Sequence, residues 1–119
     1  MRNAREEFIE HVTKPDMPRI KCAIVKYGYN FWDDDCQKEL LLHEGYSELF
    51  YNLFLQKLDF KYDDGYGGQE LFGNIWYEDG TFSIRGEYDG SEWWEYMHCP
   101  PIPENLRRAG DEANNLPSK

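Results

Sequence analysis

Two glutamates, Glu87 and Glu92, flank an Asp-Gly dipeptide in the most acidic part of the chain. If Asp89-Gly90 forms a two-residue turn, the glutamates become direct cross-strand neighbours. Paired carboxylates can bind a cation, and a pair roughly 5–9 Å apart can hydrolyse a glycoside. No groove that would exclude water is predicted around this pair, so we favour a binding role over an enzymatic one.

Metal-binding residue types are also present. Cys36, His43, His98 and Cys99 could bind zinc, but their spacing matches no standard zinc motif. The run Asp33 to Asp35 lacks the alternating ligands and distal glutamate of a calcium loop. No base is placed beside a thiol either. We therefore expect no metal and no cofactor.

Arg85 and several aromatic residues complete a candidate binding patch. If Asp79-Gly80 is also a two-residue turn, side-chain alternation puts these residues on one face of a three-stranded meander. Indoles would stack on a ligand or partner, Arg85 and Asn74 would form hydrogen bonds, and the glutamates would supply charge. A purely structural interpretation stays open, in which Arg85 stacks on Trp94 and neutralises the carboxylates. The predicted site comprises Asn74, Trp76, Arg85, Glu87, Glu92, Trp94 and Tyr96.

The other face of the meander is predicted to be the core. The same register pairs Tyr77 with Phe82 and Ile75 with Ile84, and it places Gly73 and Gly86 beside Trp93. Glycine inside a strand often marks such a close approach. A one-residue slip in register would exchange the faces.

The remaining elements position this meander. Asn3 caps a short helix with an apolar stripe at Phe8, Ile9 and Val12, and Arg19–Tyr27 alternates as a strand. Gln37–His43 is the returning strand, although a short helix is possible. Ser47 caps a helix from Glu48 to Leu58. Its predicted apolar face comprises Leu49, Phe50, Leu53, Phe54 and Leu58.

The connections are turns, expected over Asn30–Asp35 and, as a glycine-rich flexible turn, over Asp63–Gly68. We predict an α+β fold: an antiparallel sheet with a C-terminal three-stranded meander, packed by two helices. Residues 1–106 form one domain, and 107–119 form a disordered polar tail.

Charge is concentrated on the meander. The 119-residue chain has a net charge of −10, and residues 59–98, with ten acids and two bases, contribute −8 of it. Such a surface repels phosphate backbones and attracts basic proteins, although acidity can also serve only solubility. Three cysteines without CxxC spacing and no secretory or membrane-spanning run indicate a cytoplasmic protein. The oligomeric state stays open.

The stretch from Gly65 to Pro103, GYGGQELFGNIWYEDGTFSIRGEYDGSEWWEYMHCPPIP, covers about a third of the chain. It resembles a segment of small proteins from tailed phages and prophages. The resemblance implies a phage or prophage accessory protein, and it brings no activity or catalytic residues with it. Our leading hypothesis is a non-enzymatic inhibitor that binds and blocks a basic host protein, such as one that binds nucleic acid. A small-molecule or metal-binding domain, with or without enzymatic activity, and a virion structural or assembly protein are the alternatives.

Overall fold

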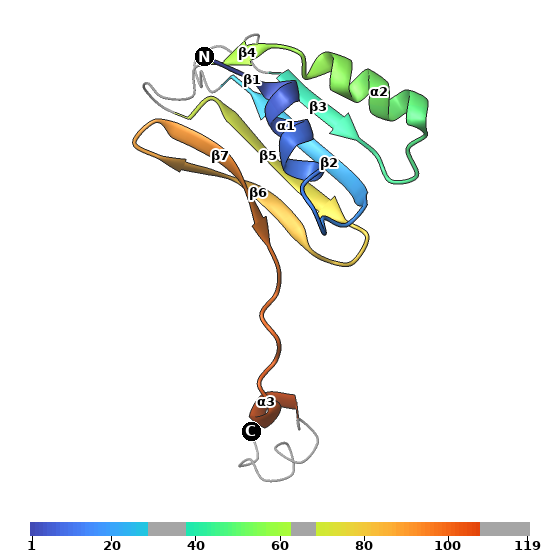
Figure 1. Cartoon of the computed structure of the whole chain (residues 1–119), viewed down its shortest axis with the longest axis vertical. Coiled ribbons are helices and arrows are strands. Elements are labelled where there is room, and N and C mark those ends of the chain that lie inside the picture. The colour runs from blue at the N-terminus through green and yellow to red at the C-terminus, as the bar shows by residue number, and fades with distance from the viewer. Residues whose placement is uncertain (29–37, 63–68, 108–119) are drawn as a thin grey trace, which may run out of the picture.

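The computed structural model describes residues 1–28, 38–62 and 69–107. Its main feature is a five-stranded antiparallel sheet in the order β3-β2-β5-β6-β7, with a second sheet of two short strands, β1 and β4 (Figure 1). The predicted α+β class and the antiparallel C-terminal meander are confirmed. The bounds are β1 Arg2–Asn3, α1 Ala4–Val12, β2 Ile20–Tyr27, β3 Lys38–Leu42, α2 Glu48–Lys57, β4 Lys61–Tyr62, β5 Leu71–Tyr77, β6 Phe82–Tyr88, β7 Ser91–Met97 and α3 Glu104–Arg107.

Three sequence predictions lie outside the described residues: the turn at 30–35, the turn at 63–68 with its Asp64-Gly65 dipeptide, and residues 108–119 of the tail. In the described ranges, no helix is long and apolar enough to cross a membrane.

Both predicted helix caps are present. The side chain of Asn3 accepts a hydrogen bond from the Glu6 backbone N–H at 2.9 Å, and Ser47 accepts one from the Phe50 N–H at 3.2 Å. Each cap satisfies a donor that the first helical turn leaves unpaired. The caps fix where α1 and α2 begin.

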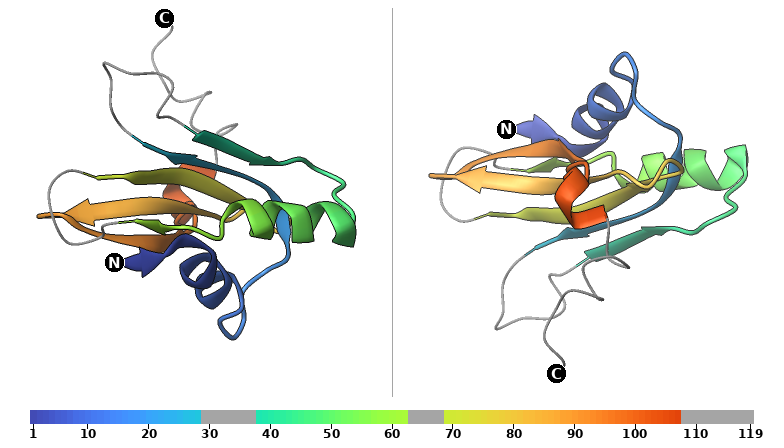
Figure 2. Two further views of the ribbon diagram at one scale, coloured as in Figure 1. Left: turned by 90° about the horizontal axis from the view of Figure 1, so that it is seen from above. Right: turned by 90° about the horizontal axis from the view of Figure 1, so that it is seen from below.

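One hydrophobic core lies between the two helices and one face of the sheet. Phe8 of α1 and Phe54 of α2 meet edge to face, with ring centroids 5.4 Å apart. Seen from above, α2 lies in front of β2 (Figure 2). The buried apolar residues are Ala4, Phe8, Ile20, Ala23, Val25, Leu40, Leu42, Phe54, Leu55, Leu58, Tyr62, Leu71, Ile75, Tyr77 and Trp94.

The predicted apolar face of α2 was wrong in its first half. Phe54 and Leu58 are buried, but Leu49, Phe50 and Leu53 are 64%, 62% and 40% exposed. The helix lies at the margin of the sheet, next to β3 (Figure 1), so only its later turns reach the core.

The meander contains one turn as predicted and one that differs. Asp89 and Gly90 have φ values of 53° and 87°, the left-handed pair of a two-residue type I′ turn. Tyr88 therefore faces Ser91 and Glu87 faces Glu92, as expected. In the first hairpin, however, Trp76 faces Phe82 and Ile75 faces Ser83, so the predicted register was wrong by one residue.

A longer loop causes the slip. The Tyr77 N–H donates to the Thr81 carbonyl at 2.9 Å, which encloses three loop residues, Glu78 to Gly80. Of these only Gly80 has a positive φ, 89°, as in a type I turn closed by a glycine bulge. The Asp79 carboxylate accepts bonds from the N–H and hydroxyl of Thr81, which lower the Asp79 pKa and hold the loop.

The slip moves β5 relative to β6 and β7. Leu71, Gly73, Ile75 and Tyr77 now share the core face with the odd residues of β6 and the even residues of β7. Each strand glycine accordingly accommodates a different indole. A Cβ on Gly86 would lie 2.6 Å from the Trp93 ring, whereas one on Gly73 would lie 3.0 Å from Trp94 and 2.5 Å from the Ile24 carbonyl oxygen.

The chain leaves the sheet after β7. Residues 98–107 run away from the strands and end in α3 (Figure 1). The prolines at 100, 101 and 103 follow the last strand residue, Met97, as predicted.

Candidate functional site

The seven residues of the predicted patch do not share one face. Asn74 and Trp76 point to the side of the sheet away from α1, while the other five lie on the side that α1 packs against. The assignment to a single face was wrong because it depended on the first-hairpin register. Arg85, Glu92 and Trp94 are buried, whereas Glu87 and Tyr96 are exposed.

Arg85 is the centre of a buried ionic cluster. Its side chain is 1% exposed, and its guanidinium lies 3.0 Å from the Glu7 carboxylate and 3.4 Å from the Glu92 carboxylate. It also donates to the Tyr62 hydroxyl at 2.8 Å and lies 5.0 Å from the centre of the Trp94 ring. Tyr62 in turn donates to Glu7. The cluster joins α1, β4, β6 and β7.

Glu87 and Glu92 avoid the like-charge conflict of their pairing. Glu92 is 3% exposed, and its oxygens accept from the backbone N–H groups of Glu70 at 2.8 Å and Leu71 at 3.0 Å. Burial nonetheless raises the Glu92 pKa. Glu87 faces solvent and accepts from the Gly90 N–H at 3.0 Å. Of the two, only Glu87 can meet a partner.

A second buried polar chain links α1 to the sheet. The His11 Nε2 lies 2.8 Å from the Ser83 hydroxyl, which lies 2.7 Å from the Tyr77 hydroxyl. Burial lowers the His11 pKa to about 4, with help from Lys14 and Arg85, and burial raises the Tyr77 pKa to about 12. All three groups are therefore neutral at pH 7. Ser83 is fully buried, so it cannot reach a substrate as a nucleophile.

Sequence reasoning did not find Glu7 or His11. Their spacing could have identified them. Together with Ala4 and Phe8 they occupy positions i, i+3, i+4 and i+7, which form the side of a helix that faces a core. A charged residue on such a stripe indicates a buried partner, here Arg85.

The side of the sheet opposite the helices is the open face. No described helix packs on it, and none of its side chains is fully buried. Trp76, Tyr88 and Trp93 are 43%, 76% and 37% exposed there. The open face consists of Cys22, Ile24, Lys26, Glu39, Leu41, Phe72, Asn74, Trp76, Phe82, Ile84, Gly86, Tyr88, Trp93, Glu95 and Met97.

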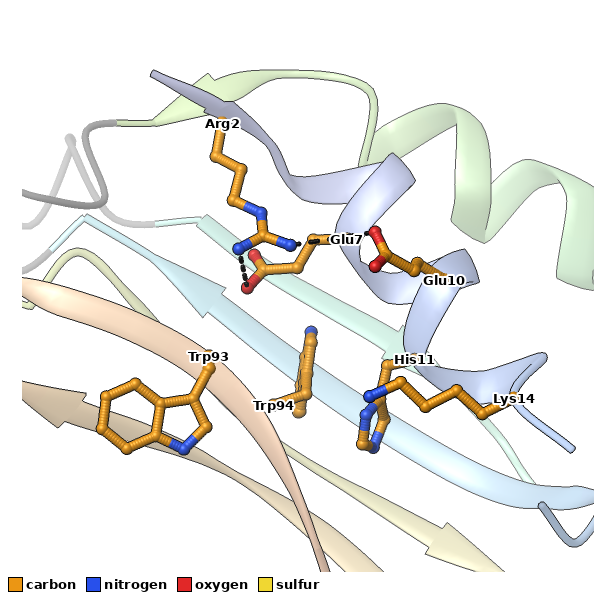
Figure 3. A pocket seen from close by; sticks show the side chains of 7 residues that line it. All are labelled: Arg2, Glu7, Glu10, His11, Lys14, Trp93 and Trp94. Carbon is orange, nitrogen blue, oxygen red and sulfur yellow. Dashed lines mark ion pairs between the residues drawn. The ribbon is translucent and has the colours of Figure 1, made fainter. Parts of the chain in front are cut away.

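A small cavity lies at the other side of β7, against α1 (Figure 3). It has a volume of about 80 Å³ and is lined by Arg2, Glu7, Glu10, His11, Lys14, Trp93 and Trp94. It is thus adjacent to the buried Arg85 cluster, through Glu7 and Trp94.

Catalytic chemistry finds little support in the described part of the chain. There, no group of three or more histidine, cysteine or acidic side chains is placed to hold a metal ion. The Cys22 thiol has a pKa raised by burial and by Glu44, so its nucleophilic thiolate is disfavoured.

The chain was compared with models of protein families, with curated proteins and with solved structures, and none of the three comparisons found a match.

Proposed function

We propose that this chain is a non-enzymatic protein-binding module that docks a basic protein on its open face. In keeping with the resemblance to phage and prophage proteins, the partner is a host protein that the module blocks, with nucleic-acid-binding proteins as the leading class. The observation that carries the proposal is the open face itself: aromatic, not covered by a described helix, and bordered by acids.

The aromatic side chains supply the contact. Trp76, Tyr88 and Trp93 lie on three adjacent strands, on the same side of the sheet, and all three are exposed. Tryptophan and tyrosine are enriched among the residues that dominate binding energy in protein interfaces. Exposed aromatic side chains gathered on one face of a small domain are typical of an interaction site.

The charges define the partner. Between residues 71 and 97 five acids are exposed, and the single base, Arg85, is buried and neutralised by Glu7 and Glu92. The exposed acids are Glu95 on the open face, Glu78, Asp79 and Asp89 in the two hairpin loops at its ends, and Glu87 on the α1 side of β6. Surfaces of one sign favour partners of the opposite sign and speed their association.

One end of the open face is hollowed. A cavity of about 290 Å³ lies beside Trp76 and Cys22 and is bordered by the Lys21–Glu44 ion pair, whose atoms are 3.3 Å apart. A side chain of the partner could be buried there, as interface anchors commonly are.

The double variant Glu39→Lys, Glu95→Lys, whose two positions both lie on the open face, tests the charge requirement. Both residues are exposed, so the variant should fold while changing the charge of the surface by four. Glu92 is unsuitable, because a buried lysine there would face Arg85. After capture from bacterial lysate and purification of the partner, we expect the variant to bind at least about tenfold more weakly in roughly 50 mM salt.

The matched control is Glu6→Lys, Glu48→Lys, which makes the same charge change on the helices, away from the open face. Its binding should be close to that of the wild type. Equal loss in both variants, or unchanged binding by Glu39→Lys, Glu95→Lys, would refute charge-dependent docking on the open face.

A further inference from the structure

We infer that the cavity between α1 and β7 binds a small oxyanion, a carboxylate or phosphate group, through the side chains of Trp94, Arg2 and Lys14. The inference is independent of the proposed function, because the cavity and the open face are separate surfaces with different residues apart from Trp93.

The first observation is an unpaired donor. The Trp94 Nε1–H is buried and has no hydrogen-bond partner among the described residues. Trp94 is 6% exposed, and its ring is held edge to face by Phe8 and stacked by Arg85 and His11. Figure 3 shows the indole nitrogen pointing toward the side of the cavity where Glu7 and Arg2 lie. Indole is a donor only, so this position requires an acceptor.

Two cations with spare donors lie at the same cavity. The Arg2 guanidinium is 3.9 Å from Glu7 and 3.8 Å from Glu10, distances too long for hydrogen bonds. Lys14 forms no ion pair with any residue of the described ranges, and it is close enough to His11 to lower the pKa of that ring. Three donors around one small space favour a ligand with several acceptor oxygens.

Two carboxylates also line the cavity, and they are not equivalent. The Glu7 carboxylate is buried and ion-paired at 3.0 Å with the Arg85 guanidinium, which it shares with Glu92. Glu10, with its side chain 72% exposed, is left as the carboxylate that opposes an incoming anion. Lys14 and Glu10, which both line this cavity, should therefore affect anion binding in opposite directions.

The size of the cavity limits the ligand. A volume of about 80 Å³ is small and holds only a few water molecules. One carboxylate or phosphate group fits this space, whereas a sugar or nucleobase would have to lie outside it.

The indole N–H signal of Trp94 in a ¹H–¹⁵N spectrum reports on the site directly. The chain has four tryptophans, and the Trp94→Phe variant identifies which signal belongs to Trp94. Inorganic phosphate and acetate are titrated separately, with sodium chloride keeping the ionic strength constant. We expect the Trp94 signal alone to move and to saturate in the low-millimolar range, which is ordinary for one small anion.

Two variants complete the test. Lys14→Ala should weaken the binding about fivefold, and Glu10→Gln should tighten it about threefold, as expected for removing one attractive and one repulsive exposed charge. Saturation with acetate alone would assign a carboxylate, and saturation with phosphate alone a phosphate. The inference is overturned if neither anion gives a saturating Trp94 shift below about 50 mM, or if Glu10→Gln weakens binding as Lys14→Ala does.

Discussion

Replacing Arg85 with methionine should lower the free energy of unfolding by about 3–5 kcal/mol, a large part of the stability of a domain of this size. The variant keeps a long side chain at this position but removes the guanidinium that pairs with Glu7 and Glu92, which are 4% and 3% exposed. Urea unfolding followed by tryptophan fluorescence measures the loss.

Glu87, two positions after Arg85 on the same strand, provides the control for the Arg85→Met variant. Glu87→Gln changes an exposed carboxylate on the same strand and should alter the unfolding free energy by less than about 0.5 kcal/mol. Adding Glu7→Gln and Glu92→Gln to Arg85→Met removes the buried charges and should recover part of the stability. An Arg85→Met variant that loses under about 1 kcal/mol would show that the cluster does not hold the fold together.

Acidification should destabilise the protein through His11. Its pKa is about 4 in the folded protein, against 6.5 for an unperturbed histidine, so the unfolded chain binds a proton that the folded chain does not. The contribution of neutral His11 is fully present above pH 6.5 and is lost as the pH falls toward 4. The difference corresponds to about 3 kcal/mol.

The variant His11→Gln isolates this effect. It keeps a neutral side chain that can bond Ser83, and the decline in unfolding free energy between pH 6.5 and 4 should become about 3 kcal/mol smaller than in the wild type. The comparison is needed because Glu92, with a raised pKa, acts in the opposite direction at the acidic end. A wild-type decline no steeper than that of the variant would argue against a buried neutral His11.

Much of the fold could be predicted from local patterns. Asn3 and Ser47 are capping residues followed by apolar spacing, and both helices begin where predicted. Asp89-Gly90 adopts the type I′ conformation that its sequence favours, so the β6–β7 register was also predictable. In each case the signal lies within a few residues of the feature it specifies.

The first hairpin could not be predicted in the same way. Asp-Gly suits both a two-residue turn and a three-residue loop that ends in a glycine bulge, because both place glycine at a positive φ. The choice at Asp79-Gly80 depends on the bonds from Thr81 to Asp79 and on the pairing of β5 with β2. The one extra residue in this loop decides which side chains of β5 share a face with those of β6 and β7.

The sequence analysis paired Arg85 correctly with Trp94 and Glu92 but predicted the wrong surroundings for it. Arg85 does stack on Trp94 and bind Glu92, as the structural interpretation of the sequence held. Its other partner, Glu7, is 78 positions earlier in the chain, and no local pattern identifies such a contact. Which aromatic residues are exposed on the open face depends on the sheet as a whole. Trp76 was predicted to be on a binding face, whereas Tyr88 and Trp93 were predicted to be in the core.

The most direct test of docking on the open face is a calorimetric titration of the purified partner with two matched double variants. Trp76→Ala, Tyr88→Ala removes two exposed aromatic side chains from the open face, and Leu49→Ala, Phe50→Ala removes two comparably exposed apolar side chains from α2. The account predicts a loss of about 2 kcal/mol or more of binding free energy for the first variant and none for the second. Loss of binding in the α2 variant, with the open-face variant binding like the wild type, would contradict it.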